Sequence, residues 1–432
     1  MTNPILIKNI NLLSEDCARW VKDSALLIKG RKITSIHPDT SQKIEACQVV
    51  DGKGGYLMPG LFEFHGHFYG RATSEMRSQH EAYCPLYLSG GVTTVKTPGE
   101  FEPDLTWQWK QDIEKGEKVG PRIMTGGYYF DPMDTIIRWF HPCATLEEVE
   151  AAFPKRDMIS DFFKVYSSMT EPWVRRVCEL AHAVGKKVYG HLGKCTTTDA
   201  INAGLDGVEH GFFTVSEFYT ALSGKIDDSA LEALDINSDL VRRVQALLVE
   251  KQTAVTPTCL TFRLSGKWFT DWMDKVDAWR YLSAEGLEKQ RNMRKDMDSK
   301  PEACDQEQRL IEKQYKYVGE LYKQGARIFA GTDPSYPMMI PGEALWLEAE
   351  NLARCGLSTT DILRALTIEA AKELGVSEIT GSIAVGKEAD LILLAEDPLQ
   401  DIRNLSSLQR VWKAGKAYDP KALKDMAVGK LR

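Results

Sequence analysis

The sequence predicts an α/β fold, a (β/α)₈ or TIM barrel joined to a small β-sandwich domain that both ends of the chain build. Strand-like sequence occurs at both ends, and between them short apolar runs alternate with amphipathic helical stretches. The length of 432 residues suits one large barrel with an accessory domain. With 43% hydrophobic residues and 10 tryptophans, the chain can bury a sizeable core, which excludes disordered and fibrous classes.

We expect the small domain to consist of residues 1–58 and 382–432, since chain termini tend to lie close together. The strand-like runs at both ends are short and rich in β-branched residues or bounded by Gly and Asp. They are Ile5–Ile10, Ser24–Lys29 and Lys32–Ile36 at the start, and Gly381–Ile383, Asp390–Ala395 and Arg410–Lys413 at the end.

Residues 59–381 carry the pattern expected of the barrel, in which eight apolar runs each precede a connection. The runs are Leu61–Phe64, Val92–Val95, Arg122–Thr125, Phe162–Val165, Val188–Gly190, Val208–Glu209, Ala254–Thr256 and Ile328–Ala330. Helical stretches follow several of them, for example Glu171–Val184, which ends before Gly185 where a helix C-cap is expected. Eight alternating strands and helices predict a (β/α)₈ barrel.

Two connections, near residues 212–252 and 260–325, are longer than a loop and a helix require. The second contains Trp268, Trp272 and Trp279 before a Lys/Glu-rich stretch that is helical by composition. We expect a solvated helical pair with aromatic residues packed on the barrel, in preference to a lid or a dimer face.

The net charge of −7 argues against nucleic acid or an anionic membrane as a partner, because either would favour a basic surface. The nine cysteines are scattered without a C-x-x-C pair, which indicates free thiols in a reducing compartment. No signal-peptide pattern or long apolar run is present, so we expect a cytoplasmic protein that acts on a small molecule. Whether it forms a homo-oligomer is left open.

Metal-ligand residue types end several of the predicted strands. His65 and His67 form an H-x-H pair after the first run, and on a strand residues two apart point to the same side. His191, His210 and Asp333 end the fifth, sixth and eighth runs. The chain has only eight histidines, and half of them occupy these positions. Because the active sites of such barrels lie at the carboxyl ends of the strands, we expect these side chains to meet there.

Lys164 is a charged residue in the apolar fourth run. One interpretation is a buried ammonium paired with Asp161 or Glu209, since an unpaired buried charge is costly. The alternative is that its amine has reacted with carbon dioxide, giving a carbamate whose two oxygens bridge two cations.

On these motifs the sequence resembles the amidohydrolase superfamily over nearly its whole length. The segment Met58-Pro59-Gly60-Leu61 through His67 is similar to that superfamily's strand leading into H-x-H, and Gly331–Asp333 to its closing strand. The segments Leu363–Ala371, Gly381–Ile383 and Gly386–Leu391 are similar to its tail. The segments Gly204–Gly211 and Val255–Thr258 resemble the imidazolonepropionase-related branch, which includes prolidase-like dipeptidases.

The resemblance implies a barrel of the metal-dependent hydrolase type with two divalent ions, zinc before Mn²⁺, Fe²⁺ or Co²⁺. It implies that His65, His67 and Asp333 hold one ion, that His191 and His210 hold the other, and that carboxylated Lys164 bridges them. A hydroxide shared by the ions would attack an amide carbonyl. Asp333 would act as general base and then as general acid.

The implied activity is hydrolysis of an amide or peptide C–N bond in a dipeptide, an N-acyl amino acid or a cyclic amide. Deamination is disfavoured because Leu192-Gly193-Lys194 follows His191, where deaminase branches place a glutamate third. Ser167-Ser168 stands where dipeptidase-like members often carry Gly-Gly, so the substrate is not identified. The alternatives are a mononuclear imidazolonepropionase-like ring hydrolase and, ranked lower, a non-catalytic scaffold related to dihydropyrimidinase.

Candidates to hold a substrate carboxylate by charge-assisted hydrogen bonds lie in or near loops of the active-site face. They are Tyr129, Arg138, His141 and Arg263. The other histidines, His37, His80 and His182, are expected to be surface or packing residues.

Overall fold

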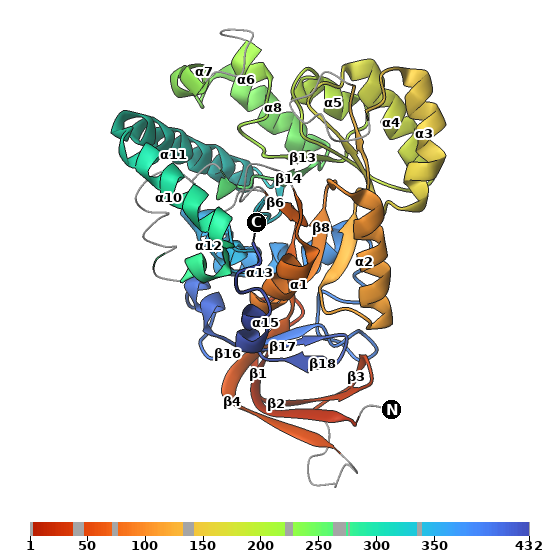
Figure 1. Cartoon of the computed structure of the whole chain (residues 1–432), viewed down its shortest axis with the longest axis vertical. Helices are drawn as coiled ribbons and strands as arrows, with labels where there is room; N and C mark the ends of the chain where they lie inside the picture. The colour runs from red at the N-terminus through yellow and green to blue at the C-terminus, as the bar shows by residue number, and fades with distance from the viewer. Residues whose placement is uncertain are drawn as a thin grey trace.

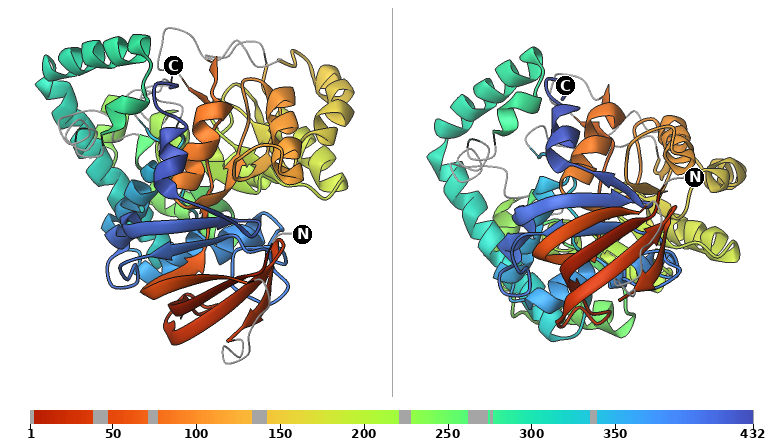
Figure 2. Two further views of the ribbon diagram at one scale, coloured as in Figure 1. Left: turned by 60° about the horizontal axis from the view of Figure 1, so that its bottom comes forward. Right: turned by 90° about the horizontal axis from the view of Figure 1, so that it is seen from below.

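The computed structural model describes residues 3–37, 47–70, 77–132, 142–220, 228–261, 274, 277–334 and 339–431 (Figure 1). Within these ranges a sheet built from both ends of the chain lies beneath a larger α/β body. Figure 2 shows the strands from the two ends side by side at the base of the molecule.

The terminal sheet contains seven strands in the order β18-β17-β16-β4-β1-β2-β3. They are β1 (Ile5–Leu13), β2 (Trp20–Lys29), β3 (Lys32–Ile36), β4 (Gln48–Pro59), β16 (Leu391–Leu394), β17 (Leu408–Lys413) and β18 (Lys416–Tyr418). All seven belong to one hydrogen-bonded sheet, which confirms a β-sheet domain formed by both ends of the chain, and its form as a sandwich stays a prediction. The expected strand at Gly381–Ile383 is wrong, because that segment is irregular.

Strand β4 was not predicted because its sequence, with Asp51, Gly52 and Gly54, is typical of a turn. It instead runs parallel to β1 with a register shift opposite Ile10. A Cβ at Gly52 would lie only 2.3 Å from Cγ2 of Ile10, so the close approach of the two strands requires glycine there.

The larger body contains two sheets whose strands run parallel to one another. The three-stranded sheet has the order β5 (Leu61–Glu63), β8 (Val92–Thr97) and β9 (Arg122–Thr125). The six-stranded sheet has the order β10 (Tyr129–Phe130), β11 (Phe163–Val165), β12 (Val188–Gly190), β13 (Gly207–Glu209), β14 (Ala254–Thr256) and β15 (Arg327–Ile328). Each of the eight predicted runs overlaps one of these strands, and β10 is an additional one.

Helices follow most of these strands and surround the sheets in Figure 1. They include α1 (His80–Ser89), α2 (Pro103–Lys115), α3 (Leu146–Met158), α4 (Glu171–Ala183), α5 (Thr197–Asn202), α8 (Asp239–Glu250), α12 (Glu343–Arg354), α13 (Thr359–Ala365), α14 (Ile368–Glu373) and α15 (Pro420–Asp425). Helix α4 confirms its prediction. It buries Val174, Val177 and Ala181 on one face and is followed by Gly185 at a φ of 73°.

The described parts of the two long connections contain several helices. The first contains α6 (Glu217–Thr220) and α7 (Asp228–Ala233) before α8, and the second contains η2 (Ala278–Tyr281), α10 (Ala284–Asp298) and α11 (Pro301–Lys323). Helices α10 and α11 lie along one edge of the molecule (Figures 1 and 2). Trp279 is partly buried against the core, whereas Trp268 and Trp272 lie outside the described residues.

Three further short elements are present among the described residues. Strands β6 (Tyr69–Gly70) and β7 (Arg77–Ser78) pair antiparallel just after β5, and η3 (Ile402–Ser407) precedes β17. None of the described helices is both long and apolar enough to cross a membrane.

Candidate metal centre

The ends of β5, β13 and β15 bring three predicted ligands together. One donor atom each from His65, His210 and Asp333 lies within 4.8 Å of the others. These residues are far apart in sequence, and the parallel strands place them at one edge. A histidine and carboxylate cluster of this size can hold a divalent ion.

The backbone directs these side chains through unusual conformations. His210 and Asp333 have positive φ angles of 61° and 48°, in the left-handed region that His and Asp tolerate better than most residues. The Asp333 amide donates to the His65 carbonyl at 2.7 Å, which fixes the segment after β15 against the end of β5. A Cβ at Gly331 would lie 2.6 Å from Cβ of His65, so this approach requires glycine.

His67 lies against Asp333 on one side of this group. Its Nε2 is 3.3 Å from Oδ1 of Asp333, and its Nδ1 is 3.0 Å from the Gly99 carbonyl oxygen. Burial disfavours the charged imidazolium, but the hydrogen bond to Asp333 and the nearby Glu100 outweigh burial and raise the pKa of His67 to about 9. His67 and Asp333 thus form a hydrogen-bonded pair, and Nε2 of His67 has to lose its proton before both side chains can hold the same cation.

His65 contacts the carboxylate of Glu209 through its Nδ1 atom. Its Nδ1 lies 2.7 Å from Oε2 of Glu209, and Oε1 of the same carboxylate accepts from Nζ of Lys96 at 2.5 Å. Burial lowers the pKa of His65 to about 4 in spite of Glu209. The low pKa keeps the imidazole neutral, and the hydrogen bond to the carboxylate keeps its one proton on Nδ1. Nε2 is therefore available as a ligand.

His191 and His210 form the other side of the cluster. Their rings lie 4.6 Å apart between centroids, and the His210 ring lies 4.7 Å from that of His65. Nδ1 of His210 is 2.7 Å from the Thr258 hydroxyl. Burial lowers the pKa of His210 to about 3 and holds that of His191 well below its usual value. Neutral imidazoles are the form that binds metal.

Lys164 on β11 is buried, and its Nζ has no hydrogen-bond partner among the described residues. Its Nζ lies 4.0 Å from Oε1 of Glu209. Burial lowers the pKa of its amine to about 7. The interpretation that Lys164 pairs with Asp161 is wrong, because the Asp161 carboxylate accepts from Lys110 at 2.6 Å and from the Thr125 amide.

Glu63 is a further buried carboxyl that the sequence analysis did not consider. It accepts hydrogen bonds from the amides of His65 and Thr332 and from the Thr332 hydroxyl. Burial, opposed by these hydrogen bonds, raises its pKa to about 8. Glu63 thereby ties the end of β5 to the segment that carries Asp333. Its signal in the sequence was a charged residue inside the first apolar run.

Of the four proposed substrate-binding residues, only Tyr129 belongs to the described residues. It lies on β10 next to Lys164 in register, and its hydroxyl donates to the Gly99 carbonyl at 3.1 Å. Its role toward a substrate stays a prediction. Arg138, His141 and Arg263 lie outside the described residues.

The remaining histidines lie away from the cluster, as expected. His37 and His182 are exposed or partly exposed, and His182 pairs with Asp206 at 2.9 Å. His80 is buried on α1 between the rings of Phe68 and Trp109.

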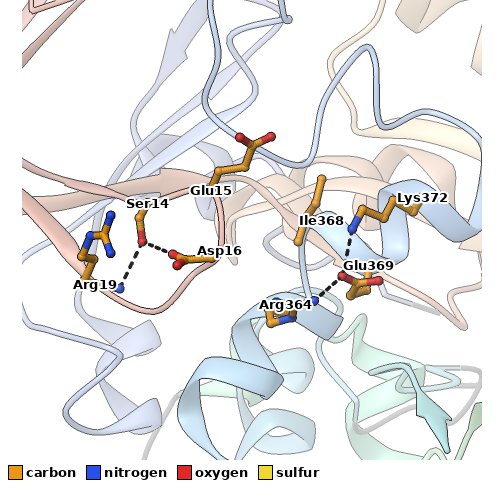
Figure 3. Close-up of a pocket in the computed structure, with 8 residues that line it drawn as sticks. All are labelled: Ser14, Glu15, Asp16, Arg19, Arg364, Ile368, Glu369 and Lys372. Atoms are coloured by element: carbon orange, nitrogen blue, oxygen red, sulfur yellow. Dashed lines mark hydrogen bonds and ion pairs between the residues drawn. The ribbon is translucent and has the colours of Figure 1, made fainter.

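A cavity of about 450 Å³ lies elsewhere, between the β1–β2 turn and helices α13 and α14 (Figure 3). None of the predicted metal ligands lines it. Its charged groups pair within the wall, since Glu369 accepts from Arg364 at 2.7 Å and from Lys372 at 3.1 Å. It is therefore distinct from the candidate metal centre.

Comparison with known proteins matches the sequence model of the amidohydrolase family to residues 56–418. This chain belongs to the amidohydrolase family. The match runs from the end of β4 through β18, and so includes the strand ends that carry the histidine cluster.

Individual relatives are more distant. An L-hydantoinase of Paenarthrobacter aurescens is 28% identical over 120 residues, which are 28% of this chain and 25% of that protein. An imidazolonepropionase of Arthrobacter sp. (strain FB24) is 36% identical over 107 residues, which are 23% of this chain and 26% of that protein. These matches thus span about a quarter of the relatives' lengths.

Similarity to solved structures extends over the whole chain. The crystal structure of an Xaa-Pro dipeptidase with bound methionine aligns with a TM-score of 0.70 and 20% identity, covering 96% of this chain and 100% of that one. At this identity the likeness shows the fold, which is that of a TIM-barrel protein.

Proposed function

We propose that this protein hydrolyses an amide or peptide bond at a two-metal centre formed by His65, His67, Lys164, His191, His210 and Asp333. The substrate would be a dipeptide, an N-acyl amino acid or a cyclic amide. The observation that carries the proposal is the convergence of donor atoms from His65, His210 and Asp333 within 4.8 Å. His67 and His191 lie beside this group on opposite sides.

The site is proposed to lie at the mouth of a closed eight-stranded barrel. Two backbone hydrogen bonds support closure, because they join the two parallel sheets at both edges. The Asp161 amide donates to the Thr125 carbonyl at 2.7 Å, and the Phe64 amide donates to the Ala330 carbonyl at 2.9 Å.

The donor set fits divalent metal ions. His65, His67 and His210 are buried around one carboxylate, and Lys164 offers a buried amine that makes no hydrogen bond to the described residues. An amine in that position fits the carbamate interpretation, because a carbamate replaces a costly ammonium with an anion that binds cations. When bound, the ions would polarise the carbonyl and acidify a water molecule, and His and carboxylate ligands suit zinc among other metals.

Asp333 is placed to move the proton. Its side chain is 14% exposed, whereas those of His65, His67 and His210 are 3 to 4% exposed, so Asp333 is more accessible to a substrate than these three histidines. Hydrogen bonding to His67 and the nearby imidazoles outweigh its burial and keep its pKa well below the usual range. As a carboxylate, it can accept a proton from the attacking water at Oδ1 or Oδ2 and return it to the leaving amine.

The test combines metal analysis with a substrate screen. We expect close to two zinc ions per chain after loading with zinc and bicarbonate, and amine release from some members of a panel of dipeptides and N-acyl amino acids. His191→Asn should lose most activity. The matched control is His182→Asn, which changes an exposed histidine paired with Asp206 and should retain activity.

One observation favours a second candidate, the mononuclear ring hydrolase. The three closest donors, from His65, His210 and Asp333, can hold a single ion without Lys164. One zinc per chain, full turnover by Lys164→Ala and activity on a cyclic amide would favour this alternative.

A further inference from the structure

Lys96 is a fully buried lysine that the proposed reaction does not use. It lies near the carboxyl end of β8, one residue before the strand ends at Thr97, and its Nζ is 3.8 Å from the ring centroid of Tyr189 and 4.7 Å from that of Phe64. Its hydrogen-bond acceptor is Oε1 of Glu209, at 2.5 Å. The ammonium is therefore enclosed by aromatic faces and one carboxylate, which is a favourable site for a cation but a costly one to build.

The carboxylate that holds Lys96 also holds a predicted metal ligand. Oε2 of Glu209 lies 2.7 Å from Nδ1 of His65, and Glu209 is 0% exposed. An ionised carboxylate only accepts hydrogen bonds, so it fixes the proton of His65 on Nδ1 and leaves Nε2 for a metal. Glu209 also directly precedes His210 in the chain.

We propose that Lys96 is a positioning residue for the metal centre, acting through Glu209 to hold His65 in the orientation and tautomer that bind a metal ion. The inference rests on the proposed function, since it concerns the same centre. It adds a residue from β8, a strand that contributes none of the predicted ligands.

The surroundings explain why the position of Lys96 matters. A second cationic group, Nζ of Lys164, lies 4.0 Å from Oε1 of Glu209. Rotation of the Glu209 side chain toward Lys164 would weaken its hydrogen bond to His65. Loss of Lys96 would therefore disturb two predicted ligands, one by releasing His65 and the other by engaging Lys164.

A matched control exists in the terminal sheet. Lys413 is also a buried lysine, and its Nζ lies 3.0 Å from both carboxylate oxygens of Asp390. Asp390 contacts none of the predicted ligands in the hydrogen bonds and ion pairs described. Lys96→Met and Lys413→Met thus remove the same group from the same kind of pair in two places.

The experiment measures Co²⁺ affinity of the purified full chain by visible absorption, with circular dichroism to verify folding. We expect Lys96→Met to bind Co²⁺ about 10- to 100-fold more weakly than wild type, as for other groups that orient a metal-binding histidine. Lys413→Met should bind Co²⁺ within about twofold of wild type, as expected for a distant site. If Lys96→Met does not fold, Lys96→Gln replaces it with the same expectation.

A double variant tests whether the effect passes through Glu209. Lys96→Met/Glu209→Gln should bind Co²⁺ about as weakly as Glu209→Gln alone, whereas a further tenfold loss would overturn the proposed route. Unchanged affinity in Lys96→Met with a metal-binding wild type would overturn the inference alone. A wild-type chain that takes up no Co²⁺ would refute the metal centre and the inference with it.

Discussion

Two buried lysine–carboxylate pairs occupy different regions of the molecule, Lys96–Glu209 among the parallel strands and Lys413–Asp390 in the terminal sheet. In the terminal sheet, both carboxylate oxygens of Asp390 accept from Nζ of Lys413. Oδ1 of Asp390 also accepts a hydrogen bond from the Ala414 amide at 2.7 Å. In the parallel strands, Glu209 divides its oxygens between Lys96 and His65.

The difference separates a structural ion pair from one that supports a site. The Asp390 carboxylate contacts only Arg122 and groups of the terminal sheet in the hydrogen bonds and ion pairs described. The Lys413–Asp390 pair therefore stabilises the fold locally. The Glu209 carboxylate transmits its constraint to His65, beside Lys164 and the other predicted ligands. Both lysine–carboxylate pairs are buried and carry the same charges. They differ in what the second carboxylate oxygen contacts, which is His65 for Glu209 and again Lys413 for Asp390.

The largest effect is expected at Lys164, which lies next to the first pair. Lys164→Ala should lower kcat/KM by at least about 100-fold, since it removes a predicted ligand rather than a supporting group. Steady-state assays on the substrate found by screening measure this loss. Lys110→Ala is the control, because Lys110 instead pairs with Asp161. Turnover by Lys164→Ala equal to that of Lys110→Ala would remove Lys164 from the site.

Breaking the second pair should affect stability without affecting the metal centre. Asp390→Ala leaves the buried Lys413 ammonium without its main partner, and such a change typically costs about 3–5 kcal/mol. Urea denaturation would measure the free energy of unfolding. Metal content per folded chain should stay at the wild-type value, and a loss of metal would show that the two regions are coupled.

The sequence predicts those parts of the fold and of the candidate site that depend on short local patterns. The run Val188-Tyr189-Gly190-His191 predicted both a strand and a ligand position, because burial and strand ends are local properties. The role of Lys96 was not predicted, since the run was taken to end at Val95 and nothing local shows that Lys96 meets Glu209. A charged residue closing an apolar strand was the available signal.

The terminal sheet illustrates the same limit. Strands β1 to β3 were predicted from their β-branched residues, whereas β4 was missed because Gly52 and Gly54 suggest a turn. Gly52 serves the close approach to β1, which depends on a partner strand distant in sequence, whereas Gly54 takes a positive φ of 76°. Tertiary contacts of this kind override local preference.

A buried histidine outside both pairs provides a smaller test. Nε2 of His80 lies 3.0 Å from the neutral Thr106 hydroxyl, and burial lowers the pKa of His80 to about 3 from 6.5. Between these values the unfolded chain binds a proton that the folded chain does not, so stability falls as pH falls. His80→Gln should reduce the loss between pH 6.5 and pH 5 by about 1.5 kcal/mol, measured by denaturation at each pH. Parallel curves for both proteins would contradict the assigned pKa.

The smallest effect is expected at an exposed pair. Arg175 donates to Glu171 one turn earlier on α4, at 2.8 Å, with side chains 48% and 34% exposed. Arg175→Ala should change the free energy of unfolding by less than about 0.5 kcal/mol, because solvent screens the pair. A loss comparable to that of Asp390→Ala would mean that burial does not determine the strength of these pairs.

The central claim is tested most directly by anomalous diffraction at the zinc edge, on crystals grown at neutral pH with zinc and bicarbonate. We predict two peaks about 3.5–4 Å apart, bordered by the five histidine and aspartate side chains, with branched density beyond Nζ of Lys164. A single peak with an unmodified lysine would contradict the two-metal account, and no peak among these side chains would contradict the metal centre itself.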